Sequence, residues 1–181
     1  IGGSNPDYAT ISAAVTDLTT NGISGTTTFN IRTGTYNEQV SLDTIIGASA
    51  NDTVVFQSEA GAQVIMTYEP TGFEDNYVVK FNGADYVTFK DMTLISTGTT
   101  GKSYVFNFQN GSENITLEND SIIGTSNVDI QDGIYHAVIY LDGQNYNIAI
   151  RNNTILNGSY GIFSRDVIGL NISNNTINNF Y

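Results

Sequence analysis

The sequence predicts an all-β solenoid of stacked coils, preceded by one short α-helix. Two observations carry this prediction: an internal repeat in the second half of the chain, and a single amphipathic segment near its start. The repeated segments align without gaps over eight residues, and their starts are 28, 33 and 22 residues apart: Val87–Leu94, Ile115–Ile122, Ile148–Ile155 and Leu170–Ile177. A short period with insertions is typical of coils of short strands that stack on one another.

The helix is expected between Asp7 and Asn21. Apolar residues recur there at spacings of three and four, as on one helix face: Tyr8, Ile11, Ala14, Val15 and Leu18. Because an uncovered first coil would offer an open strand edge, we expect this helix to cap it. The chain 1–181 is thus predicted to be one domain, with a cap at about 7–22 and coils over about 23–181. The repeat is still running at the last residues, so we expect a longer parent protein.

Equivalent residues of stacked coils should form ladders along the solenoid, about 4.8 Å apart. Two inward ladders are predicted: Val87, Ile115, Ile148 and Leu170, then Phe89, Leu117, Ile150 and Ile172. A third ladder falls at a coil corner: Asp91, Asn119, Asn152 and Asn174. Asn and Asp tolerate left-handed backbone at turns, which explains much of the chain's excess of 22 Asn residues.

The composition excludes several classes of function. Six Lys and Arg against 18 Asp and Glu give a formal charge of −12, without the basic stripe that nucleic acids or anionic membranes require. No apolar run approaches the roughly 20 residues of a membrane-spanning helix, so no membrane insertion is expected. The absence of cysteine excludes disulfides, thiolate metal sites and cysteine nucleophiles.

The pattern resembles the right-handed parallel β-helix proteins of the pectin-lyase-like superfamily. Four segments are similar to the first coil of pectin methylesterases, the last of them matching a G-x-Y-x-E pattern: Asp7–Ile11, Ala13–Val15, Phe29–Arg32 and Gly34–Glu38. The catalytic Q-D-T-L, D-F-I-F-G and G-R-P-W runs of those esterases are missing, and Gln131-Asp132 retains only the first pair. The later Asn-rich coils resemble repeats of exported and cell-surface proteins of the Bacteroidota. The resemblance implies a secreted or cell-surface location.

Candidate catalytic residues are few. Lyases of this superfamily use a basic residue beside carboxylates that hold Ca²⁺. His136, the one histidine, follows Asp129 and Asp132 in the longest insertion, where binding loops are often built. Arg165 interrupts an apolar strand end. The catalytic candidates are therefore His136, Arg165 and Asp132. No cofactor is expected, although Asp129 and Asp132 are candidates for a Ca²⁺ site.

A more coherent surface is the outer face of a strand that precedes each repeat. If Phe81, Phe108, Leu141 and Phe163 point inward, Lys80, Asn107, Tyr140 and Ile162 form one outer row, and Asn82, Gln109, Asp142 and Ser164 form the next. Amides, carboxylates and an interleaved tyrosine can bind sugar hydroxyls and stack on a pyranose. The glycan-binding candidates are Lys80, Asn82, Asn107, Gln109, Tyr140 and Asp142. Alternatively, these residues only provide the polar cover that any solenoid needs.

The sequence therefore predicts a non-catalytic β-helical module of an exported or cell-surface protein, serving adhesion, scaffolding or glycan binding. The alternative is a polysaccharide-active enzyme, either a polysaccharide lyase or a carbohydrate esterase, whose catalytic coils lie partly outside this segment. The expected partners are a polysaccharide or cell-surface glycan and further domains of the same longer chain.

Overall fold

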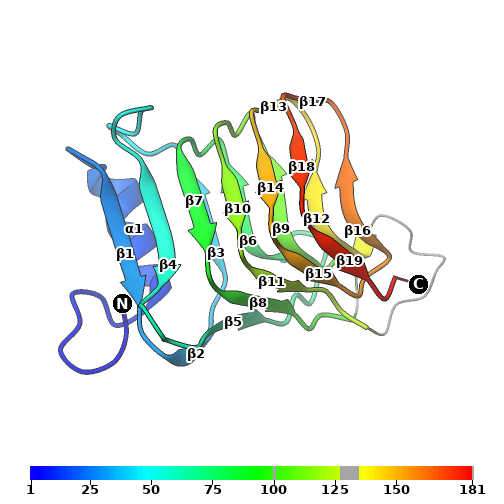
Figure 1. Ribbon diagram of the computed structural model, residues 1–181, viewed down its shortest axis with the longest axis horizontal. Helices are drawn as coiled ribbons and strands as arrows, with labels where there is room; N and C mark the ends of the chain where they lie inside the picture. The colour runs from blue at the N-terminus through cyan, green and yellow to red at the C-terminus, as the bar shows by residue number, and fades with distance from the viewer. Residues whose placement is uncertain (100, 127–134, 181) are drawn as a thin grey trace.

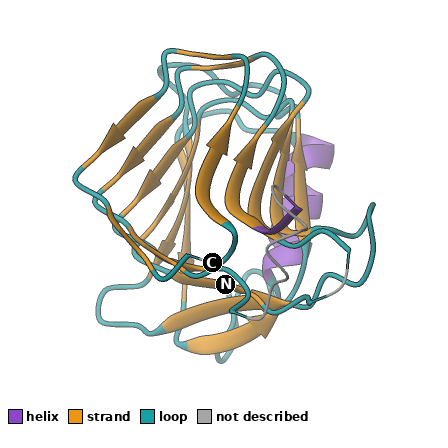
Figure 2. Ribbon diagram, turned by 90° about the vertical axis from the view of Figure 1, so that its right-hand side faces the viewer, coloured by secondary structure: helices purple, strands orange, loops and turns teal. Residues whose placement is uncertain are grey.

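The computed structural model describes residues 1–99, 101–126 and 135–180. The described chain forms one helix and three long parallel sheets, wound as a right-handed parallel β-helix (Figure 1). Neighbouring strands within a sheet come from successive coils. Figure 2, in which the end that carries β16 and β19 faces the viewer, shows the sheets enclosing a common interior. The predicted fold class is confirmed.

Each complete coil contributes one strand to each sheet. Sheet A contains β1 (Thr27–Ile31), β4 (Val54–Ser58), β7 (Val87–Lys90), β10 (Thr116–Glu118), β14 (Ala149–Arg151) and β18 (Asn171–Ser173). Sheet B contains β2 (Gly34–Asn37), β5 (Val64–Tyr68), β8 (Thr93–Ser96), β11 (Ser121–Ile123), β15 (Thr154–Leu156) and β19 (Thr176–Asn178). Sheet C contains β3 (Val40–Asp43), β6 (Tyr77–Asn82), β9 (Tyr104–Gln109), β12 (Ala137–Leu141) and β16 (Tyr160–Ser164). A short pair joins β13 (Asn145–Tyr146) to β17 (Val167–Ile168).

The predicted helix is α1 (Ile11–Asn21), and it packs against β3 at the N-terminal end of the stack (Figure 1). It begins later than Asp7 because Thr10 is its N-cap, whose side chain accepts a hydrogen bond from the Ala13 amide at 3.0 Å. The buried face is the predicted stripe without Tyr8: Ile11, Ala14, Val15 and Leu18. Tyr8 precedes the helix, and its ring packs edge-on against Phe29 at 5.9 Å.

The G-x-Y-x-E segment ties the first coil to this helix. The Glu38 carboxylate accepts hydrogen bonds from the amides of Ile11 and Ser12, at 3.2 and 2.7 Å, and from the Ser12 hydroxyl at 2.6 Å. Free amides at a helix start favour such a negative partner. The Tyr36 hydroxyl donates to the Arg32 carbonyl at 2.9 Å. This segment therefore fixes the position of α1 on the coil.

The inward ladders lie where the sequence predicted them. Phe89, Leu117 and Ile150 are fully buried and adjacent in register, and Ile172 follows on β18. Towards the N-terminus the same ladder continues as a stack of rings, with Phe29–Phe56 and Phe56–Phe89 centroids 4.7 and 4.9 Å apart. Stacked apolar side chains thus form one continuous core along the solenoid.

The corner ladder of Asp91, Asn119, Asn152 and Asn174 is confirmed, since all four residues have φ between 55° and 61°. A second left-handed corner, which was not predicted, directly precedes the first inward ladder: Tyr86, Asn114, Asn147 and Gly169. Here the side-chain amide of Asn147 donates to the side-chain oxygen of Asn114 at 3.3 Å.

Next to the first corner lies a polar ladder of the buried Asp120 and Asn153 and the half-buried Asn175. The side-chain amides of Asn153 and Asn175 donate to the carbonyls of Leu117 and Ile150 in the preceding coil, at 3.0 and 2.7 Å. Asp120 Oδ1 accepts from the Met92 amide at 2.9 Å, whereas its Oδ2 has no hydrogen-bond partner within the described part of the chain. The side-chain group at this position is therefore an amide in Asn153 and Asn175 and a carboxyl in Asp120.

The predicted facing of β16 is wrong by one residue. Phe163 pairs with Tyr140 on the outer face and Ile162 pairs with Ile139 on the inner face, the reverse of the prediction. Only six positions separate Ser164 from Leu170, compared with seven from Leu141 to Ile148, so this connection is one residue shorter. A one-residue slip in a strand exchanges its two faces.

Along the described ranges, no helix is both long and apolar enough to cross a membrane.

Candidate functional site

A groove of about 670 Å³ lies over the outer face of sheet C. One end is formed by Asn76, Lys102 and Tyr104, and the other by residues 109–111, Gln144 and Tyr146, with Tyr140 and Asp142 along its side. This volume lies within the ~300–1,000 Å³ typical of small-molecule sites. Because Tyr104 begins β9 and Gln109 ends it, the groove runs parallel to the strands rather than along the solenoid.

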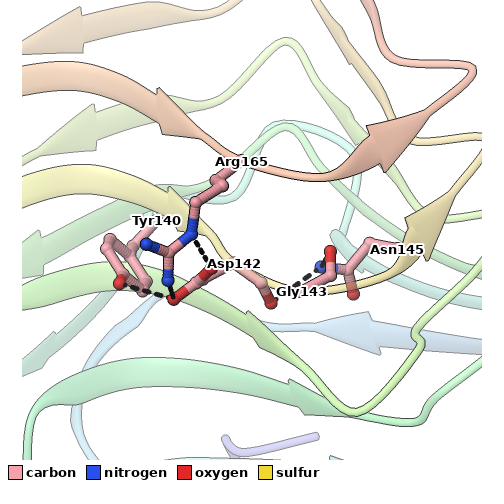
Figure 3. Close-up of polar contacts among 5 residues, drawn as sticks. All are labelled: Tyr140, Asp142, Gly143, Asn145 and Arg165. Carbon is pink, nitrogen blue, oxygen red and sulfur yellow. Dashed lines mark hydrogen bonds and ion pairs between the residues drawn. The ribbon is translucent and has the colours of Figure 1, made fainter.

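Three polar side chains meet at the side of the groove (Figure 3). Arg165 Nε and Nη2 donate to the two Asp142 carboxylate oxygens at 2.7 and 2.6 Å, and the Tyr140 hydroxyl donates to Oδ2 at 2.9 Å. The hydrogen bonds from Arg165 lower the pKa of Asp142 most, and the hydrogen bond from Tyr140 lowers it further. Burial and the bond to Asp142 raise the pKa of Tyr140 to about 12. At neutral pH the site therefore holds a carboxylate, a guanidinium and a neutral phenol.

The backbone beside this cluster is fixed by Asn145. Its side-chain amide donates to the carbonyls of Asp142 and Gly143, both at 3.2 Å (Figure 3), and its carbonyl oxygen accepts from the Ser112 amide at 3.1 Å. Asn145 is fully buried. The turn that carries Asp142 is therefore held from inside the molecule, as preorganised binding requires.

Aromatic rings stack on this outer face. Tyr104 and Tyr140 lie 4.5 Å apart at 13°, and Tyr140 and Phe163 lie 5.2 Å apart at 9°. Both faces of the Tyr140 ring are therefore covered by its neighbours. The stacking of a pyranose on Tyr140, expected from the sequence, is excluded by this arrangement, and the hydroxyl edge is the part that can meet a ligand.

Tyr146 is an aromatic residue of the groove that the sequence did not predict. It lines the groove, is half-buried, and takes part in no ring–ring contact among the described residues. Tyr146 lies on β13, which pairs with β17. This short strand pair lies outside the repeat from which the site was predicted. A ring without an aromatic neighbour can offer a face to a sugar.

Lys102, which was also not predicted, lines the opposite end of the groove beside a pair of exposed rings. Its ammonium group lies 5.7 Å from the Phe73 ring centre and 5.5 Å from that of Tyr135. The two rings meet edge to face at 6.1 Å. These residues lie in insertions between coils, which carry no repeat signal.

The structure divides the six glycan-binding candidates. Gln109, Tyr140 and Asp142 line the groove, whereas Lys80, Asn82 and Asn107 do not. Asn107 is 1% exposed and donates to Asn76 at 3.0 Å. Asn82 is bound between Asp43 and Asn110, at 2.6 and 2.5 Å, and the Lys80 ammonium lies 4.8 Å from the Tyr77 ring centre. The side chains of these three residues bind their neighbours in the structure.

Among the catalytic and metal candidates, His136 and Arg165 lie within the described residues. His136 is 1% exposed, so it is a buried residue rather than an exposed loop residue, and its carbonyl accepts from the Ser159 amide at 3.1 Å. Arg165 forms the ion pair with Asp142. Asp129 and Asp132 lie outside the described residues. Within the described ranges, no three or more His, Asp or Glu side chains are grouped to hold a metal ion.

A second cavity, of about 730 Å³, lies at the N-terminal end between residues 1–8, α1 and β1. Its polar groups already bind one another: Tyr8 donates to Asp17 at 2.5 Å, and Arg32 Nη1 donates to the carbonyls of Gly2 and Ser4 at 3.1 and 2.7 Å. This cavity belongs to the cap, so the groove over sheet C is the better candidate site.

Comparisons with protein families, with curated proteins and with solved structures found no match to this chain.

Proposed function

We propose that this chain is a non-catalytic β-helical module of an exported or cell-surface protein, and that it binds a neutral glycan in the groove over sheet C. The observation that carries the proposal is the convergence of Gln109, Asp142 and Tyr146 on one groove. A planar amide, a carboxylate held by an arginine and an unstacked tyrosine ring are groups that together hydrogen-bond sugar hydroxyls and pack on a sugar ring.

Charge favours a neutral ligand over an acidic one. The Asp142 carboxylate is paired with Arg165, and the ammonium group of Lys102 faces two aromatic rings. The chain as a whole carries a formal charge of −12, which repels polyanions such as uronate polymers. A neutral polysaccharide avoids this repulsion, whereas an acidic one would need Ca²⁺ or the few cations.

The proton affinities at the groove favour binding over catalysis. General acids and bases work best with pKa values near the operating pH. The pKa of Asp142 is lowered by Arg165, and that of Tyr140 is raised to about 12, mainly by burial. Neither group is suited to exchange protons at neutral pH. The export of the protein is supported by the resemblance of its Asn-rich coils to exported Bacteroidota repeats.

The test is a glycan array that carries neutral xylans, mannans and glucans beside polygalacturonate, alginate and glycosaminoglycans, with and without Ca²⁺. We expect binding to neutral glycans, at least tenfold weaker in Tyr146→Ala and Gln109→Ala. The matched controls are Tyr160→Ala and Gln57→Ala, which change a tyrosine and an amide outside the groove and should bind like the wild type. Undiminished binding by both groove variants would refute the site.

The enzyme alternative is tested on the same glycans. Pectin, alginate and glycosaminoglycans are incubated with the protein, with and without Ca²⁺, and unsaturated products and released methanol are measured. We expect neither product. Turnover that disappears in His136→Ala or Arg165→Ala would replace the binding proposal with a lyase or esterase function.

A further inference from the structure

The dimensions of the groove limit what it can hold. From Tyr104 to Gln109, β9 advances five residues, which is roughly 16 Å at a strand rise of about 3.3 Å per residue. Across the strands, the lining side chains of sheet C come from β9 and β12 alone, which are adjacent strands about 4.8 Å apart. The groove therefore extends roughly 16 Å along the strands, which is about three times the spacing of about 4.8 Å between β9 and β12.

On both sides of the groove along the solenoid axis, side chains of neighbouring coils bind one another across the outer face. On the β16 side, Phe163 covers the face of Tyr140, and Arg165 reaches across to Asp142. On the β6 side, the buried Asn107 donates a hydrogen bond to the side-chain oxygen of Asn76. The side-chain amide of Asn76 in turn donates to the Phe73 carbonyl. A glycan that followed the ladder of coils would meet these paired side chains, which have fewer groups left to bind it than the residues along β9.

Aromatic surface lies inside one end of the groove and just beyond the other. Beyond the Lys102 end, Phe73 is 60% exposed and Tyr135 is 40% exposed. They adjoin the groove through Lys102 and Asn76, which line it. At the other end lies Tyr146. The stretch between these ends carries the hydrogen-bonding groups of Gln109, Tyr140 and Asp142.

From this arrangement we infer that the groove holds about three units of a neutral glycan, lying parallel to β9 and β12 and therefore across the solenoid axis, with one end on Tyr146 and the other on the Phe73–Tyr135 pair. The length follows from the roughly 16 Å of β9, about three extended sugar units. This inference rests on the proposed function, because it specifies how the proposed ligand lies. It assigns a role to Phe73 and Tyr135, which are not among the residues predicted as glycan-binding.

The test is a length series of β-1,4-linked xylo-, manno- and cello-oligosaccharides from one to six units, titrated into the protein by calorimetry. Affinity should rise up to three units and then change less than twofold up to six. In Phe73→Ala, the affinity for three units should fall five- to tenfold, to the disaccharide level, while disaccharide binding is kept. Phe73 is exposed, so this variant should fold, and Ile46→Ala, which removes another exposed apolar side chain, is the control.

The outcomes separate the inference from the proposed function. Affinity that keeps rising from three to six units, or a Phe73→Ala variant that binds three units like the wild type, overturns the transverse three-unit site and leaves glycan binding intact. Failure of every oligosaccharide and polysaccharide to bind overturns both.

Discussion

The inward residues of the first and last described coils differ in how well they are covered. At the N-terminal end, α1 and the segment before it cover the first coil, and the inward Ile31 of β1 is fully buried. In the last described coil, Ile172 and Ile177 occupy inward ladders but are 47% and 42% exposed. Ile150, one rung below Ile172, is fully buried. An inward position in a solenoid thus becomes a core position only when both of its sides are covered.

The largest expected effect sharpens this comparison within one ladder. Ile150→Ala should lower the free energy of unfolding by about 2–5 kcal/mol, because it leaves a cavity between two coils. Ile172→Ala makes the same change one rung higher, where half of the side chain already faces solvent, and should cost less than half as much. Urea unfolding followed by far-ultraviolet circular dichroism measures both. Equal losses in the two variants would show that coil position does not govern burial energy.

The next effect tests the polar ladder between these ends. Asp120→Asn should raise the free energy of unfolding at neutral pH by about 1–3 kcal/mol, because a buried polar group without a partner is costly. The new amide would take the place that Asn153 and Asn175 occupy in their coils, and would donate to the Phe89 carbonyl.

The pH dependence has a definite sign. Burial raises the pKa of Asp120 well above its ordinary value. The protonated Asp120 carboxyl therefore makes its full contribution to the free energy of unfolding below the ordinary pKa of about 3.9. This contribution is lost as the pH rises from there through the raised pKa of the native state. The advantage of Asp120→Asn should be near zero at about pH 3.5 and grow towards pH 7. A difference that stays constant across this range would contradict a protonated native Asp120.

A smaller effect breaks the cap. Glu38→Ala removes the acceptors of the Ile11 and Ser12 amides and should cost about 1–2 kcal/mol. Hydrogen exchange should increase first in α1 and β3, and the distant coils should change little. Glu69→Ala, an exposed carboxylate with no hydrogen bond or ion pair found among the described residues, is the control. Identical unfolding curves for the two variants would remove Glu38 from the cap.

The sequence predicted the repeating parts of this structure well. Asn119 and Asn152 could be assigned to a corner because their spacing recurs with the apolar ladder, and each corner residue has positive φ. The facing of Phe163 could not be obtained in this way. It depends on the length of one connection, which a single residue changes, and alternation alone cannot tell the two registers of a strand apart.

The candidate site was predictable only in part, for a related reason. Gln109 ends the repeating strand β9 and Asp142 directly follows β12, so alternation placed them outside. Lys102, Phe73 and Tyr135 belong to insertions, whose paths depend on contacts with other insertions rather than on any period. The direction of the groove was also beyond the sequence, because it depends on where Asn76 and Lys102, which lie outside the repeating strands, are placed beside β9.

The stacked pair of Tyr104 and Tyr140 has an optical consequence. The chain contains no tryptophan and eleven tyrosines, so its near-ultraviolet spectrum is free of indole bands. Two nearly parallel phenol rings 4.5 Å apart are close enough for their electronic transitions to couple. Their circular dichroism should therefore form a signal that originates at the groove. A ligand that shifts either ring would change this signal, so the unlabelled protein carries its own spectroscopic probe.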